Sequence, residues 1–302
     1  MTKNFQQQGV AIIMVLLIVA IATSLAAYIA MQQNLWQRQV ESQFDRAQAR
    51  QLGLAGINWA RAVLAEDKRT NSVDHKKEIW SLQLPAIPVE SGEVEGWIED
   101  MQGKYNLNNV VYSANDLKVF EDLLLSLGLS SNLAPVLADW IENNNTQPRP
   151  GGAKDGYYLA LPQPYRAANL PLVELGELVK VRGFDSRIID SLRPYVTVLP
   201  AKTKTPINVN FASAEVLAAA IPNFSVSDAR LLEQQRPFMK LADFNNFLQQ
   251  KGIQPVNSSD FSVESTYFWV HGTARIGNAQ VETEALLERT SQWPTVVWQS
   301  VQ

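Results

Sequence analysis

The chain has 302 residues, which is enough for a membrane segment and one or two compact domains. Its formal net charge is −4 at pH 7, so its body has no general attraction to the phosphate backbone of nucleic acids. The sequence has no cysteine, which excludes disulfides, thiol catalysts and thiolate metal sites. Its two histidines, His75 and His271, are too few for a His-rich metal site.

A long apolar segment follows the polar leader MTKNFQQQG, in which Lys3 is the charged residue. No charge occurs from Val10 to Gln37, and about 22 helical residues span roughly 33 Å, enough to cross a bilayer core. Tyr28 and Trp36 lie where interfacial aromatic side chains are expected. The segment is longer than the core of a secretory signal and ends without an A-x-A-like site, which favours a membrane anchor.

The charges around this segment leave its orientation open. Lys3 and the free amine precede it, whereas Arg38, Arg46 and Arg50 follow it. The charge bias therefore does not by itself place the body of the protein outside the cell membrane.

The apolar segment continues into an amphipathic helix, because residues 35–67 contain no proline and keep a helical period. The predicted packing face consists of Val40, Phe44, Ala47, Leu54, Ile57 and Leu64. The arginines predicted to face water are Arg46, Arg50 and Arg61. Gly53 and Gly56 are expected to weaken the helix locally. We expect one helix, half in lipid and half packed on a globular body.

These features resemble the N-terminus of type IV pilins and pseudopilins. In that superfamily a prepilin peptidase cuts after the glycine that ends a short leader, and the new amine is methylated. The resemblance implies cleavage between Gly9 and Val10. Most members carry a glutamate as the fifth residue after the cut, thought to neutralise the amine of the subunit ahead, where this chain has Met14. Met14 therefore implies a subunit with nothing ahead of it, at a filament tip.

Strand patterns occur at both ends of the body. Residues 94–101, 265–275 and 279–289 alternate between apolar and polar side chains, as half-exposed strands do. Gly277-Asn278 is the predicted hairpin turn between the last two, and Thr295–Val301 is the predicted final strand.

The middle of the chain is predicted to be helical. The expected helices cover residues 117–127, 133–141, 168–181, 187–196, 210–221, 227–236 and 241–252. Ser113 or Asn115 is the start signal of the first helix, and Gly128 is its stop signal. An internal repeat aligns residues 127–137 with 222–232 at an offset of 95 residues.

The repeat resembles a helix-hairpin-helix module, so the alternative function is a membrane-anchored nucleic-acid-binding protein. Such modules hold a phosphate on the backbone of a Gly-apolar-Gly turn. The three turns of this chain are Gly128-Leu129-Ser130, Gly183-Phe184-Asp185 and Asn223-Phe224-Ser225. None has both glycines, and Asp185 would repel phosphate, which argues against nucleic acid as a partner.

Residues 99–111, 164–178 and 205–225 are similar to the general secretion pathway protein K family, the minor pseudopilins of type II secretion systems. The resemblance implies an α+β fold, in which a long pilin-like N-terminal helix packs on a small antiparallel sheet and a large all-α insertion (helix-hairpin-helix or SAM-like) interrupts the sheet. The implied parts are a leader (1–9), a transmembrane half-helix (10–31), the rest of the helix with the first strands (32–104), the insertion (105–262) and the last strands (263–302).

This resemblance also implies a function. The protein would cap the tip of the pseudopilus, start its assembly with two other minor pseudopilins above the major pseudopilin, and so support protein export across the outer membrane. It would be made in the inner membrane as a single-pass protein, with its body in the periplasm, and processed by the prepilin peptidase. The insertion would be too wide to stack inside a filament, in agreement with Met14.

A polar cluster at residues 138–162 is the candidate metal site. Asp139, Glu142, Asn144 and Asp155 offer oxygen ligands beside several glycines, and Ca²⁺ takes 6–8 such oxygens. In the family this loop is more acidic and is similar to a calcium site, whereas here Asn144 and Lys154 stand where carboxylates are expected. A structural calcium ion and a plain solvated connection remain as alternatives, and no other cofactor is implied.

Motifs of catalysis are absent from the sequence, which contains no HExxH, no GxSxG and no P-loop. Glu99 and Asp100 are neighbours on a strand, so they point to opposite faces and do not form an acid–base pair. We therefore expect no enzyme. The residues predicted to serve packing are Trp97, Trp140, Trp269 and Trp298, and those predicted to shape turns are Asn106, Asn108, Asn109, Asn208 and Asn210. His271 is expected to face solvent.

Overall fold

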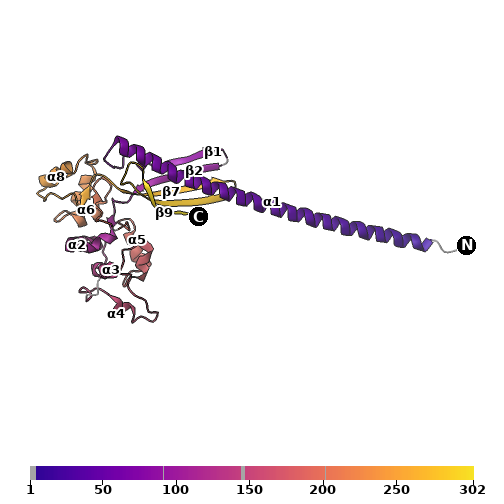
Figure 1. The fold of residues 1–302 in the computed structure, drawn as a ribbon, viewed down its shortest axis with the longest axis horizontal. Helices are drawn as coiled ribbons and strands as arrows, with labels where there is room; N and C mark the ends of the chain where they lie inside the picture. The colour runs from indigo at the N-terminus through magenta and orange to yellow at the C-terminus, as the bar shows by residue number, and fades with distance from the viewer. Residues whose placement is uncertain (1–4, 91, 144–146, 201) are drawn as a thin grey trace.

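Helix α1 (Phe5–Thr70) dominates the shape of the molecule in the computed structural model, which describes residues 5–90, 92–143, 147–200 and 202–302. Its 66 residues form a rod about 99 Å long. The N-terminal half of the rod projects away from the body, and the C-terminal half lies along a sheet (Figure 1). The prediction of one continuous helix is therefore confirmed.

The sheet has five antiparallel strands in the order β1-β2-β7-β8-β9. Their bounds are β1 Leu84–Val89, β2 Gly92–Asp100, β7 Tyr267–Ile276, β8 Ala279–Glu288 and β9 Thr295–Val301. The predicted hairpin is confirmed, since β7 and β8 pair up to Ile276 opposite Ala279. Gly277 in its turn has a φ of 52°, which a residue without a Cβ adopts readily. The long N-terminal helix and this sheet confirm the α+β, pilin-like fold class.

Strand β1 is the sheet strand that the alternation of the sequence does not predict. Pro85 and Pro88 interrupt its pattern and remove two backbone donors. The strand nevertheless forms, because it lies at the edge of the sheet and pairs with β2 alone.

The face of α1 that packs on the sheet repeats every three or four residues. It consists of Ala49, Gly53, Ile57, Ala60 and Leu64. This corrects part of the predicted packing face, since Val40, Phe44 and Ala47 are exposed. Val40 and Phe44 precede Asp45, where the β7–β8 turn ends the sheet on this side. Ala47 lies beyond that point but on the face of the helix opposite Ala49, so the sheet does not cover it.

Gly53 allows a close approach between α1 and strand β8. A Cβ at this position would lie 2.5 Å from Cγ2 of Thr283 on β8, so the glycine that weakens the isolated helix permits its packing. Arg61 also departs from expectation, because its Nε donates to the carbonyl oxygen of Pro294 at 2.9 Å and the side chain is half-buried. The other two arginines predicted to face water are exposed.

Between β2 and β7 the chain forms a helical lobe, residues 103–266, which lies at the end of α1 farthest from the N-terminus and extends to one side of it (Figure 1). Its elements are β3 (Tyr105–Asn106), η2 (Leu107–Val111), α2 (Ala114–Ser126), α3 (Leu133–Ile141), α4 (Asp155–Tyr158), η3 (Leu175–Lys180), α5 (Ser186–Leu192), β4 (Val196–Thr197), β5 (Ile207–Asn208), α6 (Ala214–Ala220), α7 (Val226–Glu233), α8 (Leu241–Gln250) and β6 (Phe261–Ser262). The predicted helix over 168–181 is wrong, because Pro171 lies within it and only a 3₁₀ segment, η3, forms. A further 3₁₀ segment, η1 (Ile79–Ser81), follows α1.

The helical lobe is built twice from one plan, which extends the repeat seen in the sequence. Its first half runs from β3 to the parallel strand β4, and its second half runs from β5 to the parallel strand β6. In the first half, the side chain of Asn108 donates to the carbonyl of Leu172 at 3.0 Å and accepts from its N–H at 2.8 Å. In the second half, Asn210 makes the same pair of bonds to Phe238, at 3.0 and 2.8 Å. These asparagines therefore hold distant segments together as well as shaping local turns.

Candidate functional site

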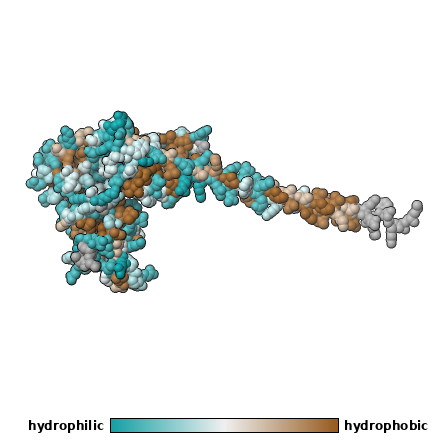
Figure 2. Space-filling model, viewed as in Figure 1, coloured by the Kyte–Doolittle hydropathy of each residue, from teal (hydrophilic) through white to brown (hydrophobic). Residues whose placement is uncertain are grey.

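The N-terminal half of α1 is an uncovered apolar surface. From Val10 to Met31 every residue is exposed, and the surface forms a continuous apolar rod (Figure 2). Among the described residues, α1 is the helix long and apolar enough to cross a membrane. So much exposed apolar surface requires lipid or other helices around it, which makes this half a candidate membrane anchor.

The predicted cleavage site and Met14 lie about one helical turn apart at the start of the rod. Gly9 and Val10 belong to α1, and Met14, four residues after Val10, is on the same face of the helix and exposed. No charged side chain lies between Val10 and Gln37, so this part of the rod offers no carboxylate to the amine of another subunit. The absence matters because an amine buried among apolar helices needs a partner.

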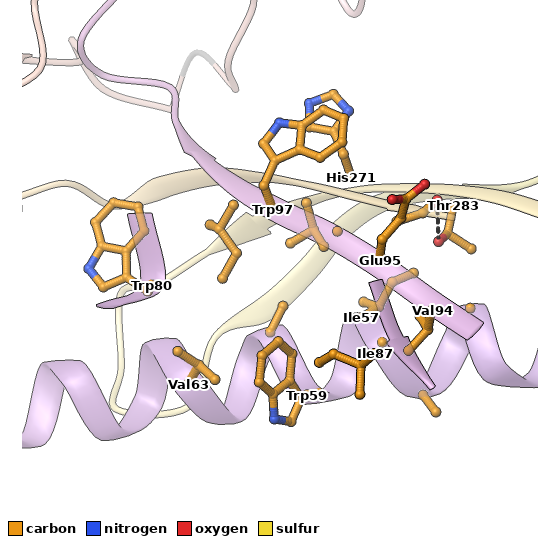
Figure 3. A pocket seen from close by; sticks show the side chains of 18 of the residues that line it. Ile57, Trp59, Val63, Trp80, Ile87, Val94, Glu95, Trp97, His271 and Thr283 are labelled. Carbon is orange, nitrogen blue, oxygen red and sulfur yellow. Dashed lines mark hydrogen bonds between the residues drawn. The ribbon is translucent and has the colours of Figure 1, made fainter. Parts of the chain in front are cut away.

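An apolar groove of about 490 Å³ opens beside the C-terminal half of α1 (Figure 3). It exists because α1 packs mainly on β7 and β8 and leaves the neighbourhood of β1 uncovered. Trp59 of α1, Ile79 of η1 and Ile87 of β1 stand around it with 53%, 79% and 43% of their surface exposed. Trp59 and Ile87 are both among the side chains that line the groove (Figure 3).

The floor of this groove is made of small residues of α1 and the apolar face of β2. Gly56 and Ala60 contribute from the helix, and Val94 and Ile98 contribute from the strand. Gly56 leaves open space, since a Cβ there would meet nothing within 4 Å. The groove is thus an apolar hollow beside a helix, with a chemistry that suits the apolar face of another helix.

The position of α1 relative to the helical lobe is fixed by Arg289, a buried residue directly after β8. Its Nη1 donates to Asp67 of α1 at 2.8 Å, and its Nη2 donates to Asp74 at 2.6 Å. Asp74 also accepts from the N–H of Ser265 at 2.6 Å. Burial, with a contribution from Glu78, raises the pKa of Asp67 to about 6. The oxygens of Asp67, Asp74 and Glu78 lie within 4.8 Å of one another, but Arg289 already supplies the positive charge there.

The residues of the candidate calcium site are only partly brought together. Asn144 lies outside the described residues. Asp139 and Glu142 both pair with Arg149, at 2.8 and 2.6 Å, whereas Oδ1 of Asp155 accepts from the N–H of Ala167 at 2.9 Å. Since donors already occupy these oxygens, the described part of this residue set does not fit a calcium ion.

The outer face of the sheet corrects the prediction for His271. Its ring stacks on Trp97 with 4.5 Å between ring centroids, and its nitrogens lie 3.6 Å from carboxylate oxygens of Glu99 and Glu284. The imidazole of His271 and the ammonium of Lys104 hold the pKa of Glu99 at about 2. His271 is therefore half-buried in a surface network and does not simply face solvent.

Most of the helix N-termini in the helical lobe are capped by the chain itself. Ser113 accepts from the N–H of Asp116 at the start of α2, as predicted, and Asp185 accepts from the N–H of Ile188 at the start of α5. Ser225 caps α7 in the same way. At the turns 183–185 and 223–225, the chain's own side chains thus already bind backbone N–H groups of the kind that hold a phosphate in a helix-hairpin-helix module. This counts against nucleic-acid binding.

Comparisons with known proteins agree with one another. Two family models described as "Type II secretion system (T2SS), protein K" match residues 103–201 and 207–268, close to the two halves of the helical lobe. Type II secretion system protein K of Pectobacterium carotovorum subsp. carotovorum is 33% identical, with 97% of this chain and 95% of that protein aligned. The protein of the same name from Pseudomonas aeruginosa is also 33% identical, over 94% of this chain and 89% of that one.

The fold has a counterpart among solved structures. A chain in the crystal structure of the GspK-GspI-GspJ complex from the type 2 secretion system of enterotoxigenic Escherichia coli superimposes with a TM-score of 0.75. The two sequences are 24% identical, and the match covers 87% of this chain and 99% of that chain.

Proposed function

We propose that this chain, which belongs to the type II secretion system protein K family and is a minor pseudopilin of that system, caps the tip of the pseudopilus. The observation that carries the proposal is the place of the helical lobe. The lobe lies at the end of α1 opposite the N-terminus and extends to one side of the helix (Figure 1). A subunit stacked above this one would have to occupy the space of the lobe, so the chain is suited to the uppermost position.

The N-terminal half of α1 supports the same position. The prepilin peptidase would cut between Gly9 and Val10, and the mature subunit would begin directly with the apolar rod, which is held in the inner membrane before assembly. The body would then lie in the periplasm. Met14 leaves this subunit without a carboxylate for the amine of a subunit ahead, which a tip subunit does not need.

The partners in this proposal are two other minor pseudopilins, with the major pseudopilin below. The solved GspK is named in a complex with GspI and GspJ, and a corresponding trimer would form here. The apolar rod packs among the partners' helices, and the groove beside Trp59 offers them a second, separate apolar surface on the body. The role is structural, in support of protein export across the outer membrane, with no reaction and no nucleic acid involved.

Two experiments test the proposal. Mass spectrometry of the protein from cells is expected to show a mature N-terminus at Val10 with a methylated amine, and an intact leader in assembled material would contradict it. Co-purification with the two partner minor pseudopilins tests the groove. Trp59→Glu places a charge in the apolar groove and is expected to lower partner recovery at least tenfold, whereas Trp298→Glu, on the outer face of the sheet, is expected to preserve it.

A further inference from the structure

We propose that Arg149 and Lys154 are built-in cations of the acidic loop, defined here as residues 139–143 and 147–155 at the junction of α3 and α4, so that these residues are held together without a divalent metal ion. The loop presents three carboxylates in the described residues, Asp139, Glu142 and Asp155, and it carries two positive side chains of its own. The two charges equal the charge that one Ca²⁺ would bring.

Asp139 is the buried centre of the loop. It lies near the C-terminal end of α3, and 1% of its side chain is exposed. Arg149 binds both of its oxygens: the backbone N–H donates to Oδ2 at 3.0 Å, and Nη1 donates to Oδ1 at 2.8 Å. A buried carboxylate is costly unless it is paired and hydrogen-bonded, and one arginine meets both needs here.

The backbone is shaped around this pair. The N–H of Gly152 donates to the carbonyl of Arg149 at 2.8 Å, with Pro150 and Gly151 between them, and Gly151 has a φ of 80°. This is the pattern of a type II turn. A Cβ on Gly152 would lie 2.0 Å from Oδ2 of Asp139, so the chain passes the carboxylate too closely for a side chain at that position. The turn thus places Arg149 against Asp139.

Lys154 closes the other side of the loop. Its Nζ donates to the backbone carbonyl of Glu142 at 2.8 Å, while the carboxylate of Glu142 lies 2.6 Å from Nη1 of Arg149. Calcium sites use such carbonyl and carboxylate oxygens together. A calcium ion bound to these oxygens of Glu142 would lie against two fixed cations, so its entry is opposed by charge repulsion.

The closed loop braces the first half of the helical lobe. Nη1 of Arg182 donates to the carbonyl of Gly152 at 3.2 Å, and the N–H of Arg182 donates to the hydroxyl of Tyr158 at 3.3 Å. Tyr158 in turn packs edge-on against buried Trp140, with 5.0 Å between ring centroids. Opening the loop therefore changes the surroundings of a tryptophan, which gives the experiment its signal.

The first measurement uses the full-length chain in detergent micelles. Its thermal unfolding is followed by tryptophan fluorescence in a chelator and in about 10 mM Ca²⁺, which is roughly tenfold above the weakest extracellular calcium affinities. We expect the same Tm in both. A calcium-dependent rise of about 3 °C or more would show that the loop takes the metal and would overturn the proposal.

Variants then test the two cations directly. Arg149→Met is expected to lower the Tm in chelator, and an unchanged Tm would overturn the role of Arg149.

Lys154→Glu removes the ammonium and adds a carboxylate, so its Tm is expected to fall in chelator and recover in Ca²⁺. Failure to recover would overturn the placement of Lys154 at a cation position. Lys154→Met, which adds no ligand, is expected to show the loss without the recovery, and exposed Lys180→Glu controls for the change in charge.

Discussion

Asp100 provides the sharpest test of the electrostatics where the sheet meets the helical lobe. It lies at the end of β2, fully buried, where Oδ1 accepts from the N–H of Gly103 at 2.6 Å. Within the described residues Oδ2 has no hydrogen-bond partner. Burial, together with the nearby charge of Asp74, raises the pKa of Asp100 from its ordinary value of 3.8 to about 7.

The sign of the effect on stability follows from proton binding. Between pH 4 and pH 7 the folded protein holds a proton on Asp100 that the unfolded chain releases. The resulting stabilisation is complete below pH 3.8 and is lost as the pH rises through about 7. A shift of about three pKa units at 1.36 kcal/mol each gives an upper limit of about 4 kcal/mol.

Asp100→Asn keeps the shape of the side chain and is neutral at every pH. The variant and the wild type are expected to have similar stability at pH 4, and the variant is expected to gain relative to the wild type as the pH rises, by up to about 4 kcal/mol at pH 8. Urea unfolding of the full-length chain in micelles, followed by tryptophan fluorescence at pH 4 to 8, measures the difference. A difference that is constant with pH, or a wild type that is the more stable at pH 8, would refute the reasoning.

Two further substitutions test the packing of α1 and the Arg289 network. Gly53→Leu forces a side chain against Thr283 and is expected to lower the free energy of unfolding in urea by about 1–3 kcal/mol. Gly56→Ala places a methyl group in open space and is expected to be neutral or stabilising. Equal losses for both variants would contradict this packing. Arg289→Met leaves Asp74 buried without its counter-ion and is expected to cost about 3–5 kcal/mol by the same assay, so a loss below about 1 kcal/mol would show that the pair contributes little.

The elements with a clear period could be predicted from the sequence. The apolar run, the hairpin around Gly277 and the short helices of the lobe follow from local pattern, turn residues and caps. Strand β1 could not be predicted in this way, because Pro85 and Pro88 indicate an interrupted strand unless the strand is known to lie at a sheet edge. Periodicity extends the predicted packing face of α1 to Val40, because it shows which residues share a face and not where the covering sheet ends.

The polar networks depend on contacts that sequence spacing does not reveal. Arg289 binds Asp67 and Asp74, which are 222 and 215 residues away in the sequence, so no local pattern predicts these ion pairs. In the acidic loop the sequence shows both charges but not their geometry. The Pro150-Gly151 turn, which brings Arg149 onto buried Asp139, is the local signal that favours a closed loop with its own counter-ion.

The place of this subunit in the filament is tested most directly by locating it there. Pseudopili assembled in cells that express the chain with a C-terminal tag can be isolated, labelled with gold against the tag and imaged by electron microscopy. A tip subunit predicts label at one end of each filament and none along the shaft. Label distributed along the shaft would contradict the account.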